Sequence, residues 1–384
     1  MAILPIIDPS SDSGSQPLSA PAVSGQVKGR YAFITLGCPK NLVDSETMLG
    51  SLSREGYELV SEPAGSDFVV INTCGFIESS RAESRSVIQE MLDLKRAGGT
   101  RGVIVAGCLP ERLEQDGGLL KQMPEIDHVV GVFGRDEITK VADRLVGGAR
   151  EQRELFRPAP IRALNDQSRL RITPQHYAYL KISEGCNHSC SFCIIPSIRG
   201  KLVSRPVGDV LSEAQRLVKA GVKELLVISQ DTSAYGVDVK FRTGFWNGRP
   251  VKTHMTQLAE ALGVMAKQYG AWVRMHYVYP YPHVDEVIEL MAEGKVLPYL
   301  DIPFQHGSAT VLKRMKRPAH AENTLARITR WREICPDLTL RSTFIVGFPG
   351  ETEEDFKATM DLVGQVRFLA AYTFQYSKRP NTPA

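Results

Sequence analysis

Three cysteines, Cys186, Cys190 and Cys193, lie within eight residues of the chain in the spacing C-x3-C-x2-C. They follow the apolar run 177–182 and Gly185, a pattern that predicts a strand opening into a loop. A loop can arrange three thiolates, here named the loop trio, around one small inorganic group. Soft thiolates bind zinc, copper(I) or iron–sulfur clusters.

The number of cysteines in this loop favours a cubic iron–sulfur cluster over structural zinc. A zinc site needs four protein ligands, usually in two separated pairs, and no second pair follows. His188 is a possible fourth ligand, but its place between two cysteines of the loop would strain a tetrahedral site. A four-iron cluster on three thiolates leaves one iron open to a substrate or cofactor. Zinc stays as the alternative, because thiolate softness does not separate the two.

Three further cysteines, here named the N-terminal trio, each come one or two residues after a predicted strand. The strands and cysteines are 31–36 with Cys38, 67–72 with Cys74, and 102–106 with Cys108. The carboxyl ends of parallel strands share one edge of a sheet, where open α/β folds bind ligands, so we expect these thiols to converge. They predict a second three-cysteine cluster site. The alternative is three unrelated buried thiols, since free cysteine is often a core residue.

Strands and helices alternate along most of the chain, which predicts an α/β fold with parallel sheets. We expect a disordered tail over 1–26, which is rich in Ser, Pro, Gly and Ala, and an N-terminal domain over 27–147. A linker is expected over 148–172 and a second domain over 173–384. The strands expected in the second domain are 177–182, 224–229, 272–279, 299–304, 340–346 and 369–376. Its expected helices are 207–220, 255–268, 284–292, 321–334 and 352–366.

Composition limits the classes of function. The formal net charge of +3 is too small to indicate nucleic-acid binding, and no apolar run approaches the about 20 residues of a membrane span. The first residues lack a basic stretch, and Pro5 interrupts their apolar run, so no secretory signal is expected. Seven cysteines form a poor disulfide framework. We therefore expect a cytoplasmic protein without a membrane or DNA partner.

The loop trio, with Phe192 directly before its last cysteine, resembles the cluster loop of radical S-adenosylmethionine (SAM) enzymes. The flanking segments 180–186 and 194–200 narrow the resemblance to the methylthiotransferases, and the segment 37–46 resembles their N-terminal domain. The resemblance implies an N-terminal parallel-sheet domain followed by a radical SAM partial barrel of six βα units. It also implies two [4Fe-4S] clusters, one on each trio, and SAM bound at the open iron of the loop cluster.

Short motifs separate two groups within this family. The tRNA-modifying group typically has Gln-Met-Asn after its first cysteine, whereas this chain has Pro39-Lys40-Asn41, as in the group that modifies a ribosomal protein. The segments 228–236 and 276–281 are also similar to that second group. The resemblance implies insertion of sulfur and a methyl group at the β-carbon of an aspartate in small-subunit ribosomal protein twelve. The alternatives are a tRNA adenosine methylthiotransferase and a non-catalytic iron–sulfur electron-transfer protein.

The same resemblance implies partners for the chain. These are ribosomal protein twelve, or the ribosomal subunit that carries it, and an electron donor such as flavodoxin or ferredoxin. Family members usually carry a C-terminal TRAM β-barrel. The radical SAM core reaches residue 384, so we expect this chain to lack that domain.

Polar residues in the loops after the strands are further candidates, because barrels build their ligand sites there. The resemblance implies that Phe192 helps to seat the adenine of SAM. Gln230, in the loop after the second strand, is expected to bind the methionine part of SAM or, alternatively, the peptide substrate. Arg205 is a candidate for a carboxylate, because guanidinium pairs bidentately with carboxylates. For Arg205 and Arg199, a solvated surface position is an equally good alternative.

The sequence identifies no catalytic acid or base. His276 is placed within a predicted strand and His306 after the next one, and a structural role is favoured for each. Asn41, Asp44 and Glu46 follow the first cysteine closely. They are candidates either for that site or for capping the first turn of a helix that starts near Asp44.

Overall fold

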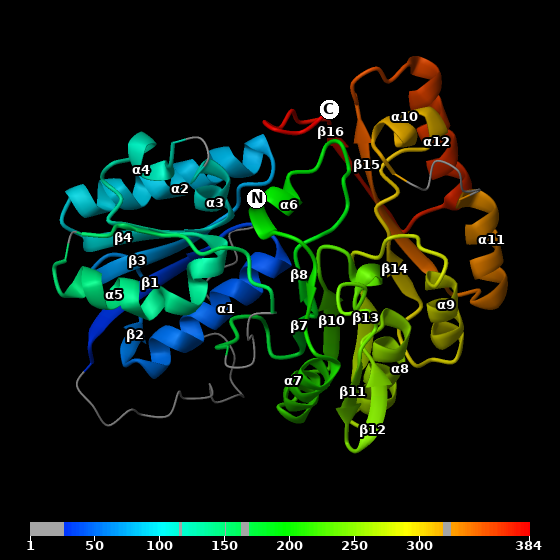
Figure 1. The fold of residues 1–384 in the computed structure, drawn as a ribbon, viewed down its shortest axis with the longest axis horizontal. Helices are drawn as coiled ribbons and strands as arrows, with labels where there is room; N and C mark the ends of the chain where they lie inside the picture. The colour runs from blue at the N-terminus through cyan, green and yellow to red at the C-terminus, as the bar shows by residue number, and fades with distance from the viewer. Residues whose placement is uncertain (1–26, 115–116, 150, 163–168, 318–323) are drawn as a thin grey trace. The chain divides into compact units, whose positions relative to one another are not determined.

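The computed structural model describes residues 27–114, 117–149, 151–162, 169–317 and 324–384. The predicted tail, 1–26, lies outside these described residues. The chain divides into two compact units, of which the first extends to Pro158 and includes Leu170, and the second holds Arg171–Ala384. Each unit contains one six-stranded parallel sheet with helices packed on it, so the predicted α/β class is confirmed (Figure 1). The domain boundaries stay a prediction.

The sheet of the first unit has the strand order β2-β1-β3-β4-β5-β6. Its strands are β1 (Gly29–Thr35), β2 (Tyr57–Leu59), β3 (Ser66–Thr73), β4 (Thr100–Gly107), β5 (His128–Val130) and β6 (Glu154–Leu155). The two strands at the edges, β2 and β6, are short and were not predicted, and β6 lies within the predicted linker. The three long strands in the middle precede the three cysteines of the N-terminal trio.

Helices cover both faces of this sheet (Figure 1). They are α1 (Pro39–Arg54), α2 (Glu78–Arg96), α3 (Cys108–Leu113), α4 (Leu119–Gln122), the 3-10 helix η2 (Val132–Glu137) and α5 (Ile138–Val146). Side chains alternate between the faces of a strand. Val69 and Ile71 of β3 therefore pack with α2, α3 and α4, whereas Phe68 and Val70 pack with α1 and α5.

Helix α1 begins earlier than the sequence predicted. It was expected to start near Asp44, but it starts at Pro39, with Cys38 as its N-cap residue. Proline suits this position because its fixed φ is already helical and its missing N–H has no partner in a first turn. The first cysteine therefore lies at the start of a 16-residue helix.

The sheet of the second unit has the order β16-β15-β14-β13-β10-β7, and every pair in it is parallel. Its strands are β7 (Tyr177–Lys181), β10 (Glu224–Ile228), β13 (Trp272–Met275), β14 (Tyr299–Asp301), β15 (Thr339–Val346) and β16 (Ala370–Gln375). These are the six strands of the predicted partial barrel. Two small antiparallel pairs were not predicted, namely β8 (Ser183–Glu184) with β9 (Val203–Ser204) and β11 (Thr243–Trp246) with β12 (Arg249–Lys252).

The helices of this unit follow the strands in alternation. They are α6 (Ile195–Arg199), α7 (Val207–Lys219), the 3-10 helix η3 (Thr232–Ala234), α8 (Met255–Lys267), α9 (Val284–Ala292), α10 (Ala309–Arg314), α11 (Thr324–Ile334) and α12 (Glu353–Val366). One apolar core joins the sheet to α7, α8, α9 and α11. Among the described residues, no helix has both the length and the apolar character needed to cross a membrane.

Two strands of the second sheet are shorter than predicted. β13 ends at Met275, so His276 follows the strand and does not lie within it, as had been expected. Tyr277 has a φ of +56°, and Gln305, after β14, has a φ of +73°. Left-handed backbone cannot continue a strand, and non-glycine residues held in it concentrate at functional sites. Both residues lie where a barrel places its ligand loops.

Candidate functional site

The N-terminal trio lies at the carboxyl ends of three neighbouring strands. Cys38 precedes α1 and follows β1, Cys74 follows β3, and Cys108 is the first residue of α3 after β4. Because β1, β3 and β4 are adjacent and parallel, their ends share one edge of the sheet. The structure therefore brings the three thiols to the same edge, with Cys38 exposed, Cys74 partly buried and Cys108 buried.

Glycines next to the cysteines allow these chain segments to touch. A Cβ atom added to Gly37, which has a φ of +91°, would lie 2.8 Å from the Cβ of Cys74. A Cβ added to Gly75 would lie 2.6 Å from the carbonyl oxygen of Cys108. Both distances are shorter than van der Waals contact allows, so a side chain at either position would push two cysteine segments apart.

Asn41 links the ends of the same strands. Its Nδ2 donates to the carbonyl oxygens of Leu36 at 2.8 Å and Thr73 at 3.1 Å, and its Oδ1 lies 3.8 Å from Sγ of Cys108. The Nδ2 of Asn72 in turn donates to the carbonyl oxygen of Asn41 at 2.9 Å. The side chain of Asn41 therefore contacts the chain at or next to each cysteine of the N-terminal trio. This supports a role of Asn41 at the cysteine site and not in capping the helix.

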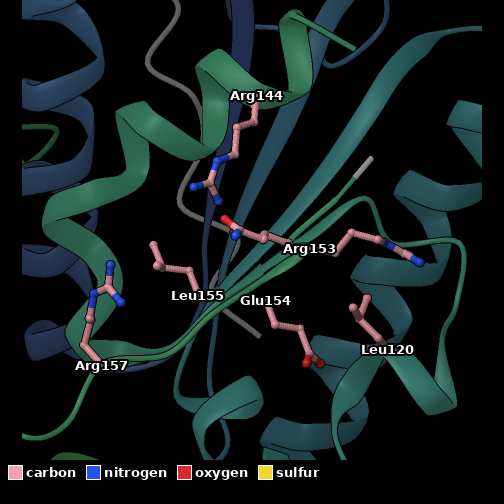
Figure 2. A pocket seen from close by; sticks show the side chains of 7 residues that line it. Leu120, Arg144, Arg153, Glu154, Leu155 and Arg157 are labelled. Carbon is pink, nitrogen blue, oxygen red and sulfur yellow. The ribbon is translucent and has the colours of Figure 1, made fainter. Parts of the chain in front are cut away.

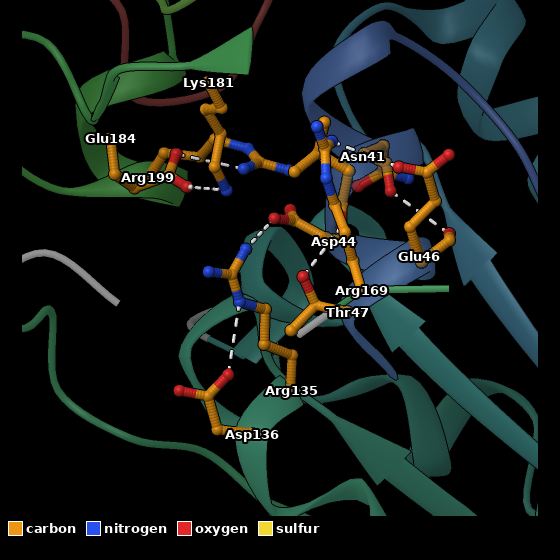
Figure 3. A network of polar contacts seen from close by, with 12 residues as sticks. Asn41, Asp44, Glu46, Thr47, Arg135, Asp136, Arg169, Lys181, Glu184 and Arg199 are labelled. Atoms are coloured by element: carbon orange, nitrogen blue, oxygen red, sulfur yellow. Dashed lines mark hydrogen bonds and ion pairs between the residues drawn. The ribbon is translucent and has the colours of Figure 1, made fainter. Parts of the chain in front are cut away.

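Asp44 and Glu46 lie buried in α1 and form ion pairs. Asp44 pairs with Arg135, which also lies 3.5 Å from Asp136, and Glu46 pairs with Arg169 at 3.1 Å. Figure 3 shows Arg135 between the two aspartates. The predicted capping role was wrong, because α1 begins further upstream and has no side-chain cap at its start.

The loop trio lies between β8 and α6 of the second unit. Gly185 opens the loop with a φ of +72°, and a Cβ there would lie 2.1 Å from the carbonyl oxygen of Lys201. The amide of Cys186 donates to the carbonyl oxygen directly after α6, at 3.1 Å. These contacts fix the backbone of the loop at its entrance.

Each sulfur of the loop trio accepts a hydrogen bond. The backbone N–H groups of His188 and Ile195 donate to Sγ of the first and last cysteines, each at 3.5 Å. Nη1 of Arg317 donates to Sγ of Cys190 at 3.9 Å. Donors of this kind stabilise negative charge on sulfur.

Burial acts against that charge when the sulfur has no cationic ligand. It raises the pKa of the Cys186 thiol to about 12, and it raises the pKa of the Cys193 thiol as well. Thiolates in this loop therefore need a cation to compensate their charge. Three soft ligands in a buried loop with N–H donors fit an iron–sulfur cluster.

Among the residues that the structure describes, no three His, Cys, Asp or Glu side chains converge closely enough to hold a single metal ion.

Glu184 is a buried carboxylate that gathers polar side chains beside the loop trio. Nζ of Lys181 lies 3.2 Å from it, Nη1 of Arg199 lies 3.0 Å away, and Nε2 of Gln230 donates to it at 2.9 Å. Figure 3 shows Lys181 and Arg199 directed at this carboxylate. Arg199 is 2% exposed, so the surface position considered for it was wrong. Within the described chain, Oε1 of Gln230 is buried without a hydrogen-bond partner, and it is therefore available to a ligand.

The other two predicted cofactor contacts, Arg205 and Phe192, are also buried. Arg205 donates to the carbonyl oxygen of Lys181 at 2.6 Å and pairs with Glu213 at 2.7 Å, so the surface alternative was wrong here too. The described contacts of Arg205 are those of a structural residue, and its role toward SAM stays a prediction. Phe192 packs edge-on against Phe348, with ring centroids 6.5 Å apart.

His188 fixes the middle of the cysteine loop. Its Nε2 lies 2.8 Å from Oδ2 of Asp231 and 3.2 Å from the hydroxyl of Tyr281, and its ring stacks on Tyr279 with centroids 4.3 Å apart. These partners follow β10 and β13. Instead of acting as a fourth metal ligand, His188 joins the loop to the carboxyl ends of two strands.

The two histidines singled out from the sequence differ in their surroundings. His306 is buried, and its Nδ1 lies 3.0 Å from the amide of Ser308 and 3.1 Å from the hydroxyl of Thr359, which are contacts of a structural histidine. His276 lies with Nδ1 3.5 Å from Oδ2 of Asp301. Its Nε2 is buried and, among the described residues, has no hydrogen-bond partner.

Two buried arginines, Arg317 and Arg379, contact the cysteine loop and were not predicted. Nη2 of Arg317 donates to the carbonyl oxygen of Pro303 at 2.7 Å, and Nη1 of Arg379 donates to the carbonyl oxygen of Phe192. Both arginines lie far from the loop in sequence. Each precedes a proline, but an Arg-Pro pair does not predict a contact with sulfur.

A pocket of about 570 Å³ lies at the β6 edge of the first unit (Figure 2). Its lining residues are Leu120, Arg144, Gln152, Arg153, Glu154, Leu155 and Arg157. None of them was predicted as a site residue, and neither trio lines the pocket. The candidate chemistry therefore lies at the two cysteine trios and not in this hollow.

Two family models match the chain. Residues 180–363 match the radical SAM superfamily, and residues 30–131 match the uncharacterized protein family UPF0004. Among solved structures, the radical SAM methyltransferase TsrM from Kitasatospora setae, with cobalamin and a [4Fe-4S] cluster bound, superposes with a TM-score of 0.62 at 14% identity. The alignment covers 92% of this chain and 76% of that one. The cobalamin-dependent SAM radical enzyme OxsB gives a TM-score of 0.54 at 12% identity, over 87% of this chain and 52% of its own. These likenesses concern the fold alone.

Curated relatives are much more similar in sequence. The ribosomal protein uS12 methylthiotransferase RimO of Pseudomonas fluorescens (strain Pf0-1) is 58% identical over 355 residues, which are 92% of this chain and 76% of that protein. The enzyme of the same name from Bordetella pertussis is 57% identical over 356 residues, 92% of this chain and 77% of its own. With identity at this level across both units, the chain belongs to the radical SAM methylthiotransferase family, in the group of the ribosomal protein uS12 methylthiotransferases.

Proposed function

We propose that this chain transfers a methylthio group to the β-carbon of an aspartate in ribosomal protein uS12, the substrate named in its relatives, giving 3-methylthioaspartate. The main observation behind this proposal is that Cys38, Cys74 and Cys108 meet at one edge of the sheet in the first unit. The loop trio of the second unit is a separate set of three thiols. A radical SAM enzyme that only cleaves SAM needs a single trio. A second trio supports an enzyme that also handles sulfur.

The cofactors of the family are two [4Fe-4S] clusters and SAM. We propose that Cys186, Cys190 and Cys193 hold one cluster, and that the N-terminal trio holds the other. When bound, these groups supply the electron, the carbon radical chemistry and the sulfur that no acid or base can provide at an unactivated C–H bond.

The residues around the loop trio are suited to hold and shield such groups. The N–H donors stabilise thiolate charge, and the raised pKa of Cys186 disfavours a free thiolate in the absence of metal. Oε1 of Gln230 offers an acceptor to the ammonium of SAM. Phe192 and its apolar neighbours exclude water, which protects a reactive radical.

One experiment tests both the substrate of the chain and the separate roles proposed for the two trios. The chain, reconstituted with iron and sulfide without oxygen, would be incubated with SAM, dithionite, and either uS12-containing ribosomal subunits or tRNA. Mass spectrometry would follow the methylthio group, and chromatography would follow 5′-deoxyadenosine. We expect Cys186→Ala to abolish both products. We expect Cys38→Ala to abolish the methylthio product while 5′-deoxyadenosine is still released.

Two outcomes would contradict the proposal. A methylthio group on tRNA alone would make the chain a tRNA-modifying enzyme. A reducible cluster without release of 5′-deoxyadenosine would make it an electron carrier.

As part of the same proposal, the physiological reductant is a low-potential protein such as flavodoxin or ferredoxin, and the chain acts in the cytoplasm. Replacing dithionite by each purified donor tests the first of these statements.

A further inference from the structure

We propose that Arg317 sets the reduction potential of the iron–sulfur cluster on the loop trio, by placing a fixed guanidinium charge against the sulfur of Cys190. This inference rests on the proposed function, because it requires a cluster at the loop trio. It goes beyond that function by assigning a tuning role to a residue outside the cysteine motif.

The position of Arg317 is fixed from three sides. Its Nη1 donates to Sγ of Cys190 at 3.9 Å, and its Nη2 donates to the carbonyl oxygen of Pro303 at 2.7 Å. Its guanidinium carbon lies 4.1 Å from the centroid of the Tyr279 ring, which is a cation–π contact. The planar fork of arginine reaches two acceptors in fixed directions while stacking on a ring, which a lysine ammonium cannot do.

The chain segment that carries Arg317 is attached to the cysteine loop. The amide of Ser191 donates to the carbonyl oxygen of Met315 at 3.1 Å, and its hydroxyl donates to the carbonyl oxygen of Arg314 at 2.8 Å. Val311, Leu312 and Met315 share one apolar cluster with Cys190 and Phe192. The segment directly before Arg317 is therefore tied to the cysteine loop by two hydrogen bonds from Ser191, which helps to hold the guanidinium close to the sulfur.

The charge of Arg317 acts in an environment where it is effective. The residue is 5% exposed, so water screens its charge weakly. Hydrogen bonds to the ligand sulfurs and net charge are among the factors that set the potentials of iron–sulfur clusters. Reduction adds negative charge to a cluster, and a nearby cation favours the reduced state. Arg317 therefore raises the potential and makes the loop cluster easier to reduce.

Arg317 differs from the other described donors to these sulfurs. Those of the first and last cysteines are the backbone amides of His188 and Ile195, which side-chain substitution leaves in place. Arg317 contributes through its side chain and carries a full charge. Its replacement thus removes one positive charge and the hydrogen bond to Cys190, while the two backbone hydrogen bonds remain.

The test is a redox titration of the full chain. The N-terminal trio is first replaced by alanine, so that the electron paramagnetic resonance signal of the reduced cluster reports the loop trio alone. In this background, Arg317→Gln is compared with Arg317→Lys and with the control Arg274→Gln. Arg274 pairs with Glu224 at 2.5 Å and stacks on Tyr299 at 4.7 Å, without a described contact to a cysteine. Midpoint potential, iron and sulfide content, and SAM affinity are measured for each.

We expect Arg317→Gln to lower the electron affinity of the cluster at least tenfold, a shift of ~59 mV toward negative potential for a one-electron couple. Arg317→Lys, which keeps the charge but not the fork, shifts the potential by less, and Arg274→Gln leaves it unchanged. Should Arg317→Gln lose its iron, the lysine variant decides, because the proposal requires a measurable negative shift there too.

The outcomes separate this inference from the function on which it rests. The parent protein of this series retains Arg317 and has alanine in place of the N-terminal trio. If it contained no iron, both the proposed cluster and the tuning role would be refuted. Iron present, with an unchanged potential in Arg317→Gln, overturns the tuning role alone. Weaker SAM binding at an unchanged potential overturns it as well, and would make Arg317 a SAM contact.

Discussion

At the scale of single residues, Asn41 is important because its amide contacts the ends of two strands. Replacement by alanine leaves the carbonyl oxygens of Leu36 and Thr73 without this donor in a buried environment. We expect Asn41→Ala to lower the free energy of unfolding by about 2 kcal/mol. We also expect lower iron content at the N-terminal trio. Urea denaturation and iron analysis check both.

The control for this prediction is an amide that is exposed. Gln268 lies at the end of α8 and is exposed, so Gln268→Ala should change the free energy of unfolding by less than about 0.5 kcal/mol. Equal effects of the two substitutions would show that the contacts of Asn41 contribute nothing specific.

Glu137 gives the first unit a defined dependence on pH. Hydrogen bonds from Arg157 and Lys140 lower its pKa from 4.5 to about 2. Since the folded-state pKa is below the ordinary value, the stabilisation is complete above pH 4.5 and is lost as the pH falls toward 2. We expect these contacts to contribute only about 1 kcal/mol to the free energy of unfolding, because solvent screens the partly exposed partners. Stability of the parent and Glu137→Gln, measured by urea denaturation across this range, should converge at the acid end.

A second carboxylate provides the comparison for that pH series. Glu58 lies 3.8 Å from Arg30, and both side chains are 56% exposed. We expect Glu58→Gln to follow the parent at every pH, because exposed pairs contribute little. A difference between the parent and Glu137→Gln that did not shrink with acid would contradict the assigned role of the Glu137 carboxylate.

At the scale of secondary-structure elements, the ends of β3 and β4 depend on Gly107. This residue has a φ of +95°, and a Cβ there would lie 2.2 Å from Oδ1 of Asn72. We expect Gly107→Ala to cost about 3 kcal/mol or more, since strain and overlap add, and to displace Cys108. Thermal unfolding and iron content check this expectation.

Gly148 serves as the control that separates backbone strain from steric overlap. It also has a positive φ, of +75°, but nothing lies within 4 Å of an added Cβ. Gly148→Ala should therefore cost only about 1 kcal/mol, from backbone strain alone. If both substitutions cost the same, steric contact at the strand end would be irrelevant.

Most elements around the cysteines could be predicted because they carry strong local signals. The buried apolar runs of β1, β3 and β4 and the glycines that end them placed three cysteines at one sheet edge. The start of α1 was misplaced, because the segment after Cys38 has no capping side chain and its proline acts through φ alone. The contact of Arg317 with Cys190 could not be predicted, since it joins positions 127 residues apart and depends on how α10 packs against the loop.

At the scale of the whole molecule, each unit has its own apolar core and its own cysteine trio. We expect the two units to unfold in separate transitions, as is common for chains with more than one domain. Leu225→Ala and Ile71→Ala, both fully buried, should each cost about 2–5 kcal/mol. Leu225→Ala should lower the transition temperature of the second unit, and Ile71→Ala should lower that of the first unit.

Calorimetry of the full chain measures both transitions in one experiment, so each variant is the control for the other. Iron content should follow the same division, with loss at the trio of the destabilised unit. A single transition that both substitutions shift equally would contradict independent folding of the units.

The start of α1 at Cys38 also affects how the metal-free protein must be handled. The first turn of a long helix favours negative charge, and the thiol of Cys38 is exposed, whereas Cys108 is buried. Alkylating reagents and dissolved oxygen should therefore attack Cys38 first. We expect brief treatment with iodoacetamide to modify Cys38 ahead of Cys108, as read by peptide mapping, and later iron loading at that edge to fail. Preparations made in air should therefore take up less iron at this edge than preparations made without oxygen.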